Sequence, residues 1–256
     1  MPIPRIVGMV HLDPLPGSPG YAGDLESVLT RARADAHALA AAGFDGIMVE
    51  NFGDAPFFAE AVPPVTIAAM TRAVSEVLAA GLPTGVNVLR NDGLGALAVA
   101  AATGASFIRV NVLSGTMYTD QGPIIGRAAE IGRARAALCP GVAILADVFV
   151  KHATPPAGLT LVDATHDLVE RGGADAIVVS GSGTGSPTDL ADLRTVAGAS
   201  PLPVYVGSGA TAATIATLLD VADGAIVGSA VKVGGIATNP VDLERAGGIV
   251  AAASGS

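Results

Sequence analysis

The chain has 256 residues, of which half are hydrophobic and only 14% are charged, and its formal net charge is −9. This length fits one large domain, and the apolar composition is typical of elements buried on two faces, as parallel sheets require. The negative net charge argues against a surface that tracks nucleic-acid phosphates, so we expect no nucleic-acid partner. A small anionic ligand is still allowed, because a local pocket can differ in charge from the whole surface.

The mean hydropathy of +0.56 raises the question of a membrane segment. The longest uncharged stretch, Thr195–Leu219, is interrupted by Pro201 and Gly207 and therefore does not predict a continuous spanning helix. The N-terminal sequence lacks a basic region followed by a long apolar core, so no signal peptide or transmembrane segment is expected. Cys139 is the only cysteine, which excludes an intramolecular disulfide and fits a cytoplasmic location.

Eight short runs rich in β-branched residues alternate with stretches rich in Ala, Leu, Arg and Glu. The runs, each expected to form a strand, are Ile6–Leu12, Gly46–Asn51, Thr84–Leu89, Phe107–Val112, Val142–Val150, Ala176–Ser180, Val204–Gly207 and Ala225–Gly228. The stretches between them are long enough for one helix each, for example Leu25–Ala42, Val65–Ala80, Leu94–Thr103 and Leu161–Arg171. Several predicted helices end on a glycine, as helix C-caps commonly do: Gly43, Gly81, Gly104, Gly172 and Gly173.

This alternation predicts parallel strands joined by right-handed crossovers. Eight units without a charged linker or a break in composition predict a single (β/α)8 TIM barrel, one domain that spans residues 1–256. An open, doubly wound sheet is the structural alternative. Three strand–helix loops are long, at residues 12–24, 113–125 and 180–187, and would lie at the C-terminal mouth of the barrel, where active sites of this fold occur.

Polar side chains gather at the ends of the predicted strands. Alternate residues of a strand share a face, so the face that includes the last strand positions can be read from the sequence. It carries Met9 and His11, Met48 and Glu50, Asn87 and Leu89, Arg109 and Asn111, then Asp147, Phe149 and Lys151, and finally Ser180. Barrel interiors are normally filled by Val, Ile and Leu, and an unpaired buried polar group costs roughly 1–3 kcal/mol. The pattern therefore favours a preorganised polar site, with a self-satisfied network as the alternative.

Individual roles at these strand ends are less constrained. Glu50 and Asp147 are the best candidates for general acid/base chemistry or for a pair of Mg²⁺ ligands, unless they pair with Arg109 and Lys151. His11 is a candidate acid/base, with a structural role in orienting a loop as the alternative. Lys151 suits a Schiff base if it is desolvated, although an ion pair with Asp147 is the favoured interpretation.

Three Gly/Ser-rich turns follow three successive apolar runs in the second half of the chain. They are Ser180–Gly185, Gly207–Gly209 and Gly228–Ser229. Backbone amides free of bulky side chains suit a phosphate, and the loops after strands 7 and 8 of a barrel are its usual phosphate site. The alternative is that any tight turn between a strand and a helix favours glycine. The sequence contains no P-loop, dinucleotide fingerprint, zinc-ligand spacing or nucleophile elbow.

We predict that substrate is held by these turns together with polar groups at the strand ends. Arg90 and Asn91 follow the third strand and are candidates for contact with an anionic substrate, although surface residues need no such role. The predicted substrate-binding residues are Asn87, Arg90, Asn91, Arg109, Asn111, Ser180, Gly181, Gly183, Thr184, Gly207, Ser208, Gly209, Gly228 and Ser229.

Several long motifs resemble those of the BtpA/SgcQ family. They are VGMVHLDPLPGSPGY (7–21), GIMVENFGDAPF (46–57), GVNVLRND (85–92), FIRVNV (107–112), ADVFVKHA (146–153) and VSGSGTG (179–185), followed by VGSG and IVGSAVK. The resemblance implies a barrel of the ribulose-phosphate-binding type. It also implies kinship to proteins of photosystem I biogenesis in one branch and of sugar uptake and metabolism in another. The family motifs fall on His11, Glu50, Asn51, Asn87, Arg90, Asn91, Asp92, Arg109, Asn111, Asp147, Lys151 and His152.

The leading hypothesis is an enzyme that acts on a small phosphorylated metabolite, a sugar phosphate or a nucleoside-derived phosphate. This fold is compatible with an isomerase, a lyase and an enzyme that cleaves glycosidic bonds. The fold alone does not distinguish between these reactions. Mg²⁺ is the one cofactor suggested, and a homo-oligomer is a weak expectation. The alternatives are a non-catalytic assembly factor for a membrane complex and a ligand-binding sensor.

Overall fold

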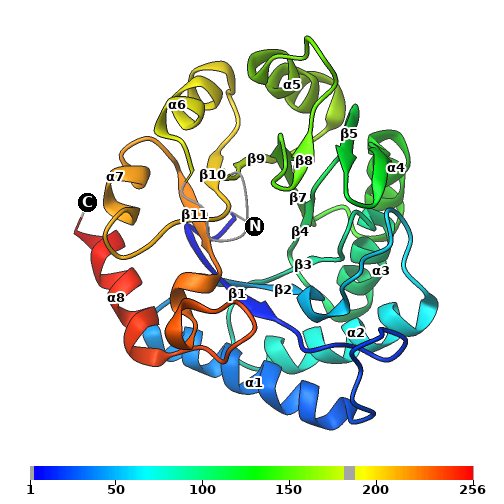
Figure 1. Cartoon of the computed structure of the whole chain (residues 1–256), viewed down its shortest axis with the longest axis vertical. Helices are drawn as coiled ribbons and strands as arrows, with labels where there is room; N and C mark the ends of the chain where they lie inside the picture. The colour runs from blue at the N-terminus through cyan, green and yellow to red at the C-terminus, as the bar shows by residue number, and fades with distance from the viewer. Residues whose placement is uncertain (1–2, 182–187, 256) are drawn as a thin grey trace.

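The computed structural model describes residues 3–181 and 188–255, and eight parallel strands in it close into a barrel (Figure 1). These strands are β1 (Ile6–His11), β2 (Gly46–Glu50), β3 (Thr84–Asn87), β4 (Phe107–Val110), β7 (Ala143–Val148), β9 (Ala176–Val179), β10 (Val204–Val206) and β11 (Gly224–Val227). Each strand pairs with the next in this order, and β1 pairs with β11 to close the ring. The predicted barrel is therefore confirmed, and each of the eight strands ends one or two residues earlier than expected.

Helices surround the barrel on all sides in Figure 1. They are α1 (Leu25–Ala42), α2 (Pro64–Leu78), α3 (Gly93–Thr103), α4 (Ala128–Leu138), α5 (Leu161–His166), α6 (Leu190–Ala199), α7 (Ile215–Leu219) and α8 (Leu243–Ser254). Shorter turns are η1 (Phe52–Asp54), η3 (Ser229–Val231) and η4 (Val233–Gly235), and η2 (Asp167–Gly172) is π-helical. No helix in the described part of the chain is both long and apolar enough to cross a membrane.

Local sequence explains where the helices start and stop. Asp24 caps the start of α1, where its carboxylate accepts a hydrogen bond from the Ser27 amide at 3.1 Å. Gly43 ends the same helix with a left-handed φ of 90°, which glycine adopts without steric cost. The predicted helix over 161–171 instead divides into α5 and the π-helical η2, which ends at Gly173.

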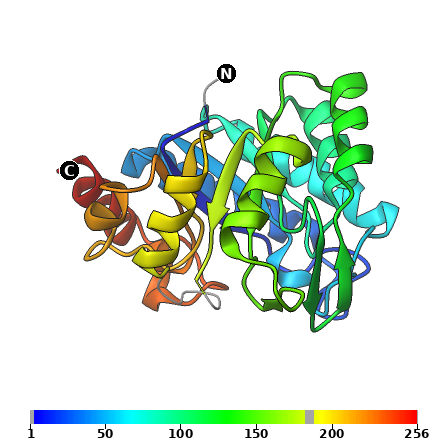
Figure 2. The same cartoon turned by 90° about the horizontal axis from the view of Figure 1, so that it is seen from above.

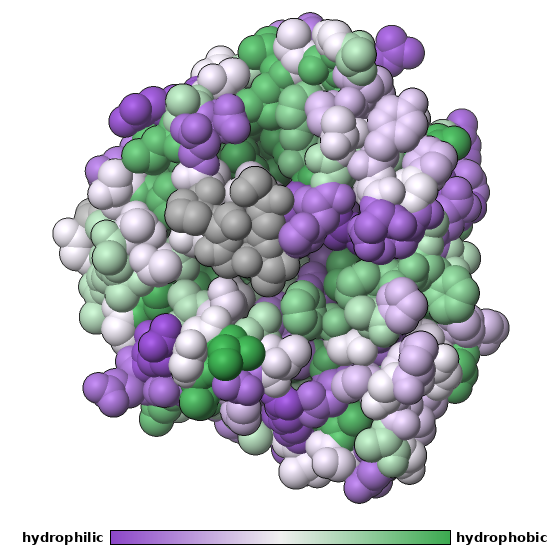
Figure 3. Space-filling view, in the orientation of Figure 1, coloured by the Kyte–Doolittle hydropathy of each residue, from purple (hydrophilic) through white to green (hydrophobic). Residues whose placement is uncertain are grey.

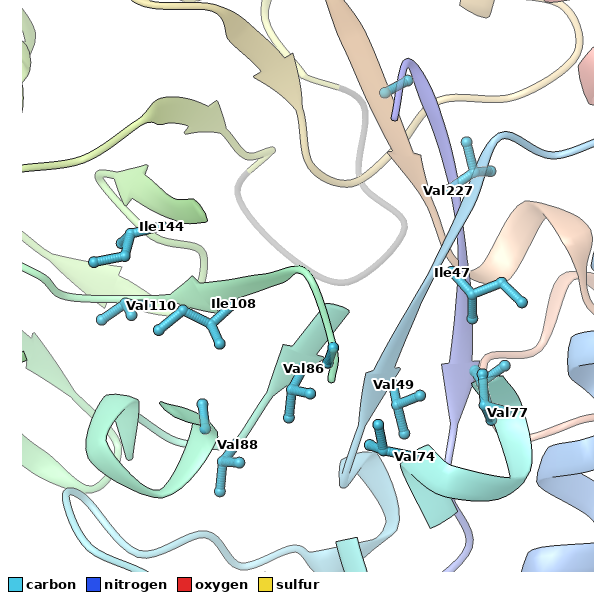
Figure 4. Close-up of a cluster of buried hydrophobic side chains, with 14 of the residues drawn as sticks. Ile47, Val49, Val74, Val77, Val86, Val88, Ile108, Val110, Ile144 and Val227 are labelled. Carbon is cyan, nitrogen blue, oxygen red and sulfur yellow. The ribbon is translucent and has the colours of Figure 1, made fainter. Parts of the chain in front are cut away.

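Two apolar layers hold the barrel together. The outer layer lies between strands and helices, where Val49 of β2 faces Val74 of α2 (Figure 4). The inner layer fills the barrel with large side chains, among them Phe107 and Tyr205. Gly85 makes room for one of them, because a Cβ at this position would lie 2.2 Å from the Phe107 ring. The polar side chains of His11, Glu50 and Asn87 lie beyond this layer, at the carboxyl ends of their strands.

The loop predicted over residues 113–125 is wrong in one respect, because it contains a β-hairpin. Strands β5 (Thr116–Thr119) and β6 (Gly122–Ile125) pair antiparallel, and β5 also pairs with β8 (Ala153–Thr154). The turn is made by Gly122 with φ 95° and by the Thr119 hydroxyl, which donates to the Gly122 carbonyl at 2.8 Å. Figure 2 shows the hairpin at the lower edge of the molecule. The small sheet anchors the chain directly after Lys151, at the mouth of the barrel.

Candidate active site

The polar strand-end side chains come together at the carboxyl end of the barrel. His11, Glu50 and Asn87 lie side by side on β1, β2 and β3, because the strand register pairs His11 with Glu50 and Glu50 with Asn87. All three are buried, as are Arg109 and Asp147. The space-filling view shows hydrophilic residues gathered close to the centre of this face (Figure 3). The predicted convergence of polar groups from several strands is thus present in the structure.

One part of this group is a closed hydrogen-bond network around Asp147. Arg109 donates to both carboxylate oxygens, with Nε at 3.0 Å and Nη2 at 2.6 Å. Asn111 Nδ2 donates at 2.8 Å and the Ser180 hydroxyl at 2.9 Å. Arg109 Nη2 also donates to the Gly207 carbonyl at 3.0 Å. Burial acts to lower the pKa of Arg109, but the charge and hydrogen bonds of Asp147 raise it above its usual value.

The predicted ion pair between Asp147 and Lys151 is therefore wrong. Asp147 pairs with Arg109, whose strand β4 lies next to β7 in the barrel. A guanidinium reaches both carboxylate oxygens at once, and such bidentate pairing is favoured over a point contact with an ammonium group.

His11 and Glu50 form a second group with unused acceptors. His11 Nδ1 lies 2.9 Å from the Ala237 carbonyl, which only accepts hydrogen bonds, so this nitrogen carries the proton. Nε2 is then an acceptor, and it lies 3.8 Å from Glu50 Oε1. The other oxygen, Glu50 Oε2, accepts from Asn87 at 2.6 Å. Burial lowers the pKa of His11 to about 4, so the ring is neutral at neutral pH.

Hydrogen bonding holds the backbone at Lys151 in place, whereas its ammonium group has no partner among the described residues. Phe149 and His152 have left-handed φ values of 48° and 58°, and Arg90 Nη2 donates to the Lys151 carbonyl at 2.5 Å. Within residues 3–181 and 188–255, the Lys151 ammonium makes no hydrogen bond or ion pair. Burial is the main cause that lowers its pKa, Arg109 and Arg90 act in the same direction, and Glu50 and Asp147 oppose them.

The glycine turns after β10 and β11 meet this group. Gly207 allows close packing, because a Cβ there would lie 2.0 Å from Val178 Cγ1. A Cβ on Gly228 would lie 3.2 Å from His11 Cε1, so this turn touches the imidazole directly. Ser208 Oγ is buried and has no hydrogen-bond partner in the part of the chain that the structure describes. The turn after β11 thus lies beside His11, and the turn after β10 carries a buried hydroxyl with no partner among the described residues.

A narrow cavity connects these parts. It is lined by His11, Glu50, Arg109 and Lys151 and by the turn residues Gly207–Ala210, Gly228 and Ser229. Its volume of about 30 Å³ has room for a small group only, so the rest of a ligand must lie outside it. Gly209, Ala210 and Ser229 also line a larger hollow of about 660 Å³ that reaches Arg245 at the start of α8.

Another large hollow in the described structure lies away from this site. It measures about 720 Å³ and is lined by residues at the amino ends of the strands, including Arg5, Arg135 and Tyr205. It contains none of the predicted site residues. Active sites of (β/α)8 barrels lie at the carboxyl ends of the strands. The small cavity beside His11 and Glu50 is therefore the candidate site, although the hollow at the amino ends is larger.

Some predicted site residues do not reach the cavity. Asn91 is occupied by the Val112 backbone, from which it accepts at 2.8 Å and to which it donates at 2.9 Å. Leu89 and Phe149, which alternation places on the site face, do not line this cavity. Leu89 lines a separate hollow with Phe58, and Phe149 lines one with Asn111 and Asp147. Gly181 is buried beyond β9, and Gly183 and Thr184 lie outside the described residues.

The two carboxylates do not form an evident metal site. In residues 3–181 and 188–255, no cluster of three or more His, Cys, Asp or Glu side chains is placed to hold an ion. Asp147 already accepts hydrogen bonds from three side chains, which leaves it poorly suited as a ligand. Mg²⁺ stays a prediction.

Two contacts that orient the site were missed by sequence reasoning. The Ala237 carbonyl fixes His11, and the segment that carries it is tied to α1 by a buried ion pair between Lys232 and Asp35 at 2.8 Å. Asp35 also accepts from the Val241 amide at 2.7 Å. A signal was available, because Asp35 interrupts the apolar stripe of α1 that includes Ala36 and Leu39.

Comparison with known proteins places the chain in a family. The sequence profile of the BtpA family matches residues 4–255. The chain belongs to the BtpA family. It is 48% identical over 249 residues to the photosystem I biogenesis protein BtpA of Synechocystis, which covers 96% of this chain and 87% of that protein. It is 49% identical over 243 residues to the protein TK2179 of Thermococcus kodakarensis, which covers 94% and 92%.

Solved structures share the fold at low sequence identity. (S)-3-O-geranylgeranylglyceryl phosphate synthase from Thermoplasma acidophilum superimposes with a TM-score of 0.62, at 18% identity and over 99% of this chain and 93% of that one. At this identity the likeness shows the fold alone, and it agrees with the TIM barrel described above.

Proposed function

We propose that this member of the BtpA family is an enzyme that binds a small phosphorylated metabolite and moves protons on it. One observation carries the proposal: the glycine turns after β10 and β11 line the same cavity as His11, Glu50 and Lys151. Phosphate-binding groups and proton-transfer groups therefore lie within reach of one small molecule.

The phosphate is assigned to Gly207–Gly209 and Gly228–Ser229. The Gly207 amide itself donates to the Val179 carbonyl at 2.9 Å, so the amides after it in this turn and those of Gly228–Ser229 are the ones assigned to the phosphate. Ser208 Oγ supplies a further polar group without a partner among the described residues. The charges near Lys151 favour an anion, since three basic groups, Arg90, Arg109 and Lys151, face the carboxylates of Glu50 and Asp147. One positive charge is left over in a chain whose net charge is −9.

Proton transfer is assigned to Glu50 and His11. The neutral imidazole offers Nε2 as an acceptor, and Glu50 Oε1 faces it at 3.8 Å, so a substrate O–H or C–H placed beside them meets two bases. Arg109 and Lys151 stabilise negative charge that develops on the substrate. Such proton movement fits an isomerase or a lyase, and the glycosidic-bond cleavage predicted from the sequence also remains within this proposal.

A structural neighbour supports the ligand class only by analogy. The Thermoplasma acidophilum synthase is named for its complex with sn-glycerol-1-phosphate, a small phosphorylated molecule. The shared barrel makes a phosphorylated ligand reasonable here, but fold alone does not carry function from one protein to another.

A second candidate function comes from the Synechocystis relative, whose name assigns it to photosystem I biogenesis. Under this alternative the chain acts by binding a membrane complex, and the strand-end carboxyl groups are dispensable. A sensor that binds the phosphorylated ligand without turning it over is the third possibility. Each predicts a different response to the loss of Glu50.

The deciding experiment is a thermal-shift screen against phosphorylated sugars and nucleotides, with and without Mg²⁺. A ligand present at 100 times its Kd is expected to stabilise the fold by roughly 2.7 kcal/mol. The effect should disappear in Gly228→Val, whose side chain would fill the space beside His11. It should persist in the control Gly132→Val on α4, where a Cβ meets no atom within 4 Å. A flat screen with folded protein would contradict the proposal and favour the assembly-factor alternative.

A further inference from the structure

We propose that Lys151 is the nucleophile of this site and forms a Schiff base with the carbonyl carbon of a phosphorylated ketone or aldehyde. The inference rests on the proposed function and deepens it by naming the substrate class. Lysine is rare among the basic residues of this chain. Of the 14 Lys and Arg residues, only Lys151 and Lys232 are lysines. Arginine supplies the other positive charges, and a guanidinium does not form an imine.

The two lysines have opposite surroundings. Lys232 is fully buried and donates to Asp35 at 2.8 Å, so its ammonium group is fully committed to a structural ion pair. Lys151 lines the cavity between the glycine turns and Glu50, and among the described residues its ammonium group has no partner. A lysine kept only to balance Asp147 would contact it, yet Arg109 occupies both oxygens of that carboxylate.

The backbone around Lys151 is held in place, while its ammonium group has no partner among the described residues. Arg90 Nη2 holds the Lys151 carbonyl at 2.5 Å, and β8 begins two residues later at Ala153. Phe149 and His152 adopt left-handed φ values that cost non-glycine residues free energy. This is the arrangement expected of a nucleophile, whose Cα must be held in place while the amine reaches a bound carbonyl.

A Schiff base forms from the neutral amine, and the surroundings make it easier for the resting ammonium group of Lys151 to release its proton. Burial is the largest influence that lowers the pKa of Lys151, and the guanidinium groups of Arg109 and Arg90 add to it. Glu50 and Asp147 act in the opposite direction, but Asp147 is bound to Arg109. Desolvation beside other cations is a known way to activate a lysine amine.

The reaction balances without an oxidant or a reductant. The amine nitrogen attacks the carbonyl carbon and a C–N bond forms. The carbonyl oxygen leaves as water with two protons, one that Glu50 first takes from the ammonium group and one that passes from the nitrogen of the adduct. The third proton of the ammonium group stays on the nitrogen of the protonated imine. The protonated imine then withdraws electrons from the adjacent carbon, so a C–H or C–C bond there breaks and the proton passes to Glu50 or His11. Water later restores the free amine and the carbonyl product.

The test is reductive trapping. The full chain is incubated with cyanoborohydride and a panel of phosphorylated ketoses and aldoses of three to six carbons, and adducts are located by mass spectrometry of peptides. We expect one stable secondary amine on Lys151, with none on Lys232 and slower reaction at the N-terminal amine. Non-phosphorylated analogues of the same sugars should react at least about tenfold more slowly, because they lack the binding energy of the phosphate.

Variants separate this inference from the proposed function. Lys151→Arg and Lys151→Met should both lose the adduct, and Lys151→Arg should keep the thermal shift given by phosphorylated ligands. Phosphate-dependent stabilisation of the wild type without any adduct on Lys151 would overturn the Schiff base and leave the proposed function standing. Labelling of the N-terminal amine as fast as Lys151 would also overturn it. A wild type that shows neither stabilisation nor an adduct would overturn both proposals.

Discussion

The Arg109–Asp147 network and the group formed by His11, Glu50 and Lys151 lie at the same end of one barrel, yet they use their polar atoms differently. In the first, each carboxylate oxygen of Asp147 accepts more than one hydrogen bond. In the second, two acceptors face each other at 3.8 Å and an ammonium group has no partner among the described residues. The network therefore forms a rigid wall of the site. The second group, which we call the open group, keeps polar atoms available to a reacting molecule.

The largest effect is expected from Glu50→Gln, which tests the open group. The amide can still accept from Asn87, so the unfolding midpoint should change little, while kcat should fall by roughly 10²–10⁴ through loss of a general base. Steady-state kinetics on a substrate found in the ligand screen would measure this. Unchanged kcat would show that the open group is not catalytic and would remove the distinction drawn above.

The next largest effect is expected from Arg109→Met, which tests the closed network. It leaves the buried Asp147 carboxylate without its counter-charge, and breaking a buried pair in this way costs about 3–5 kcal/mol of unfolding free energy. Urea denaturation would measure the loss. The double variant Arg109→Met with Asp147→Leu should recover most of it, because no uncompensated charge remains. A double variant as unstable as the single one would show that the network does not act as one unit.

The pH dependence of stability tests whether His11 is neutral when folded. Its pKa is lowered by burial from 6.5 to about 4. As pH falls below 6.5, the unfolded chain takes up a proton that the folded chain refuses until about pH 4, so stability is lost across that window. A shift of this size corresponds to a loss on the order of 3 kcal/mol.

The control for this prediction is His11→Gln, which shares every other titrating group with the wild type. Its unfolding free energy should fall less between pH 7 and pH 4, and the difference between the two proteins isolates His11. If the unfolding free energies of the two proteins fell in parallel with pH, the result would contradict a lowered pKa for His11.

The sequence allowed the barrel to be predicted because strand–helix alternation depends on local residue pattern. It also allowed the convergence of His11, Glu50 and Asn87 to be predicted, since alternation places them at strand ends and parallel register aligns them. The hairpin over β5 and β6 was missed, because short strands between turn residues give a weak pattern. Phe149 has a φ of 48°, so strand alternation ends before it and no longer predicts where its side chain lies.

Side-chain partners were harder to predict than strand faces. Asp147 had two basic candidates, and strand order in space decides between them, because β4 lies next to β7 while Lys151 follows the end of β7. The contact between Lys232 and Asp35 joins residues 197 positions apart in the chain, which no local pattern specifies. The carbonyl that orients His11 belongs to Ala237, a backbone group that no residue type identifies.

The smallest effect is expected from Ser180→Ala, at the edge of the closed network. The Ser180 hydroxyl donates to Asp147 Oδ1 at 2.9 Å, and that oxygen also accepts from Arg109 at 2.6 Å. Because the carboxylate keeps its other donors, the loss should be about 1.5–2 kcal/mol, at the low end of the range for one hydrogen bond to a charged group. Urea denaturation would measure it, and the thermal shift by phosphorylated ligands should persist, since the serine serves the wall rather than the open group. A selective loss of ligand binding at unchanged stability would show that Ser180 belongs to the open group and contacts the ligand.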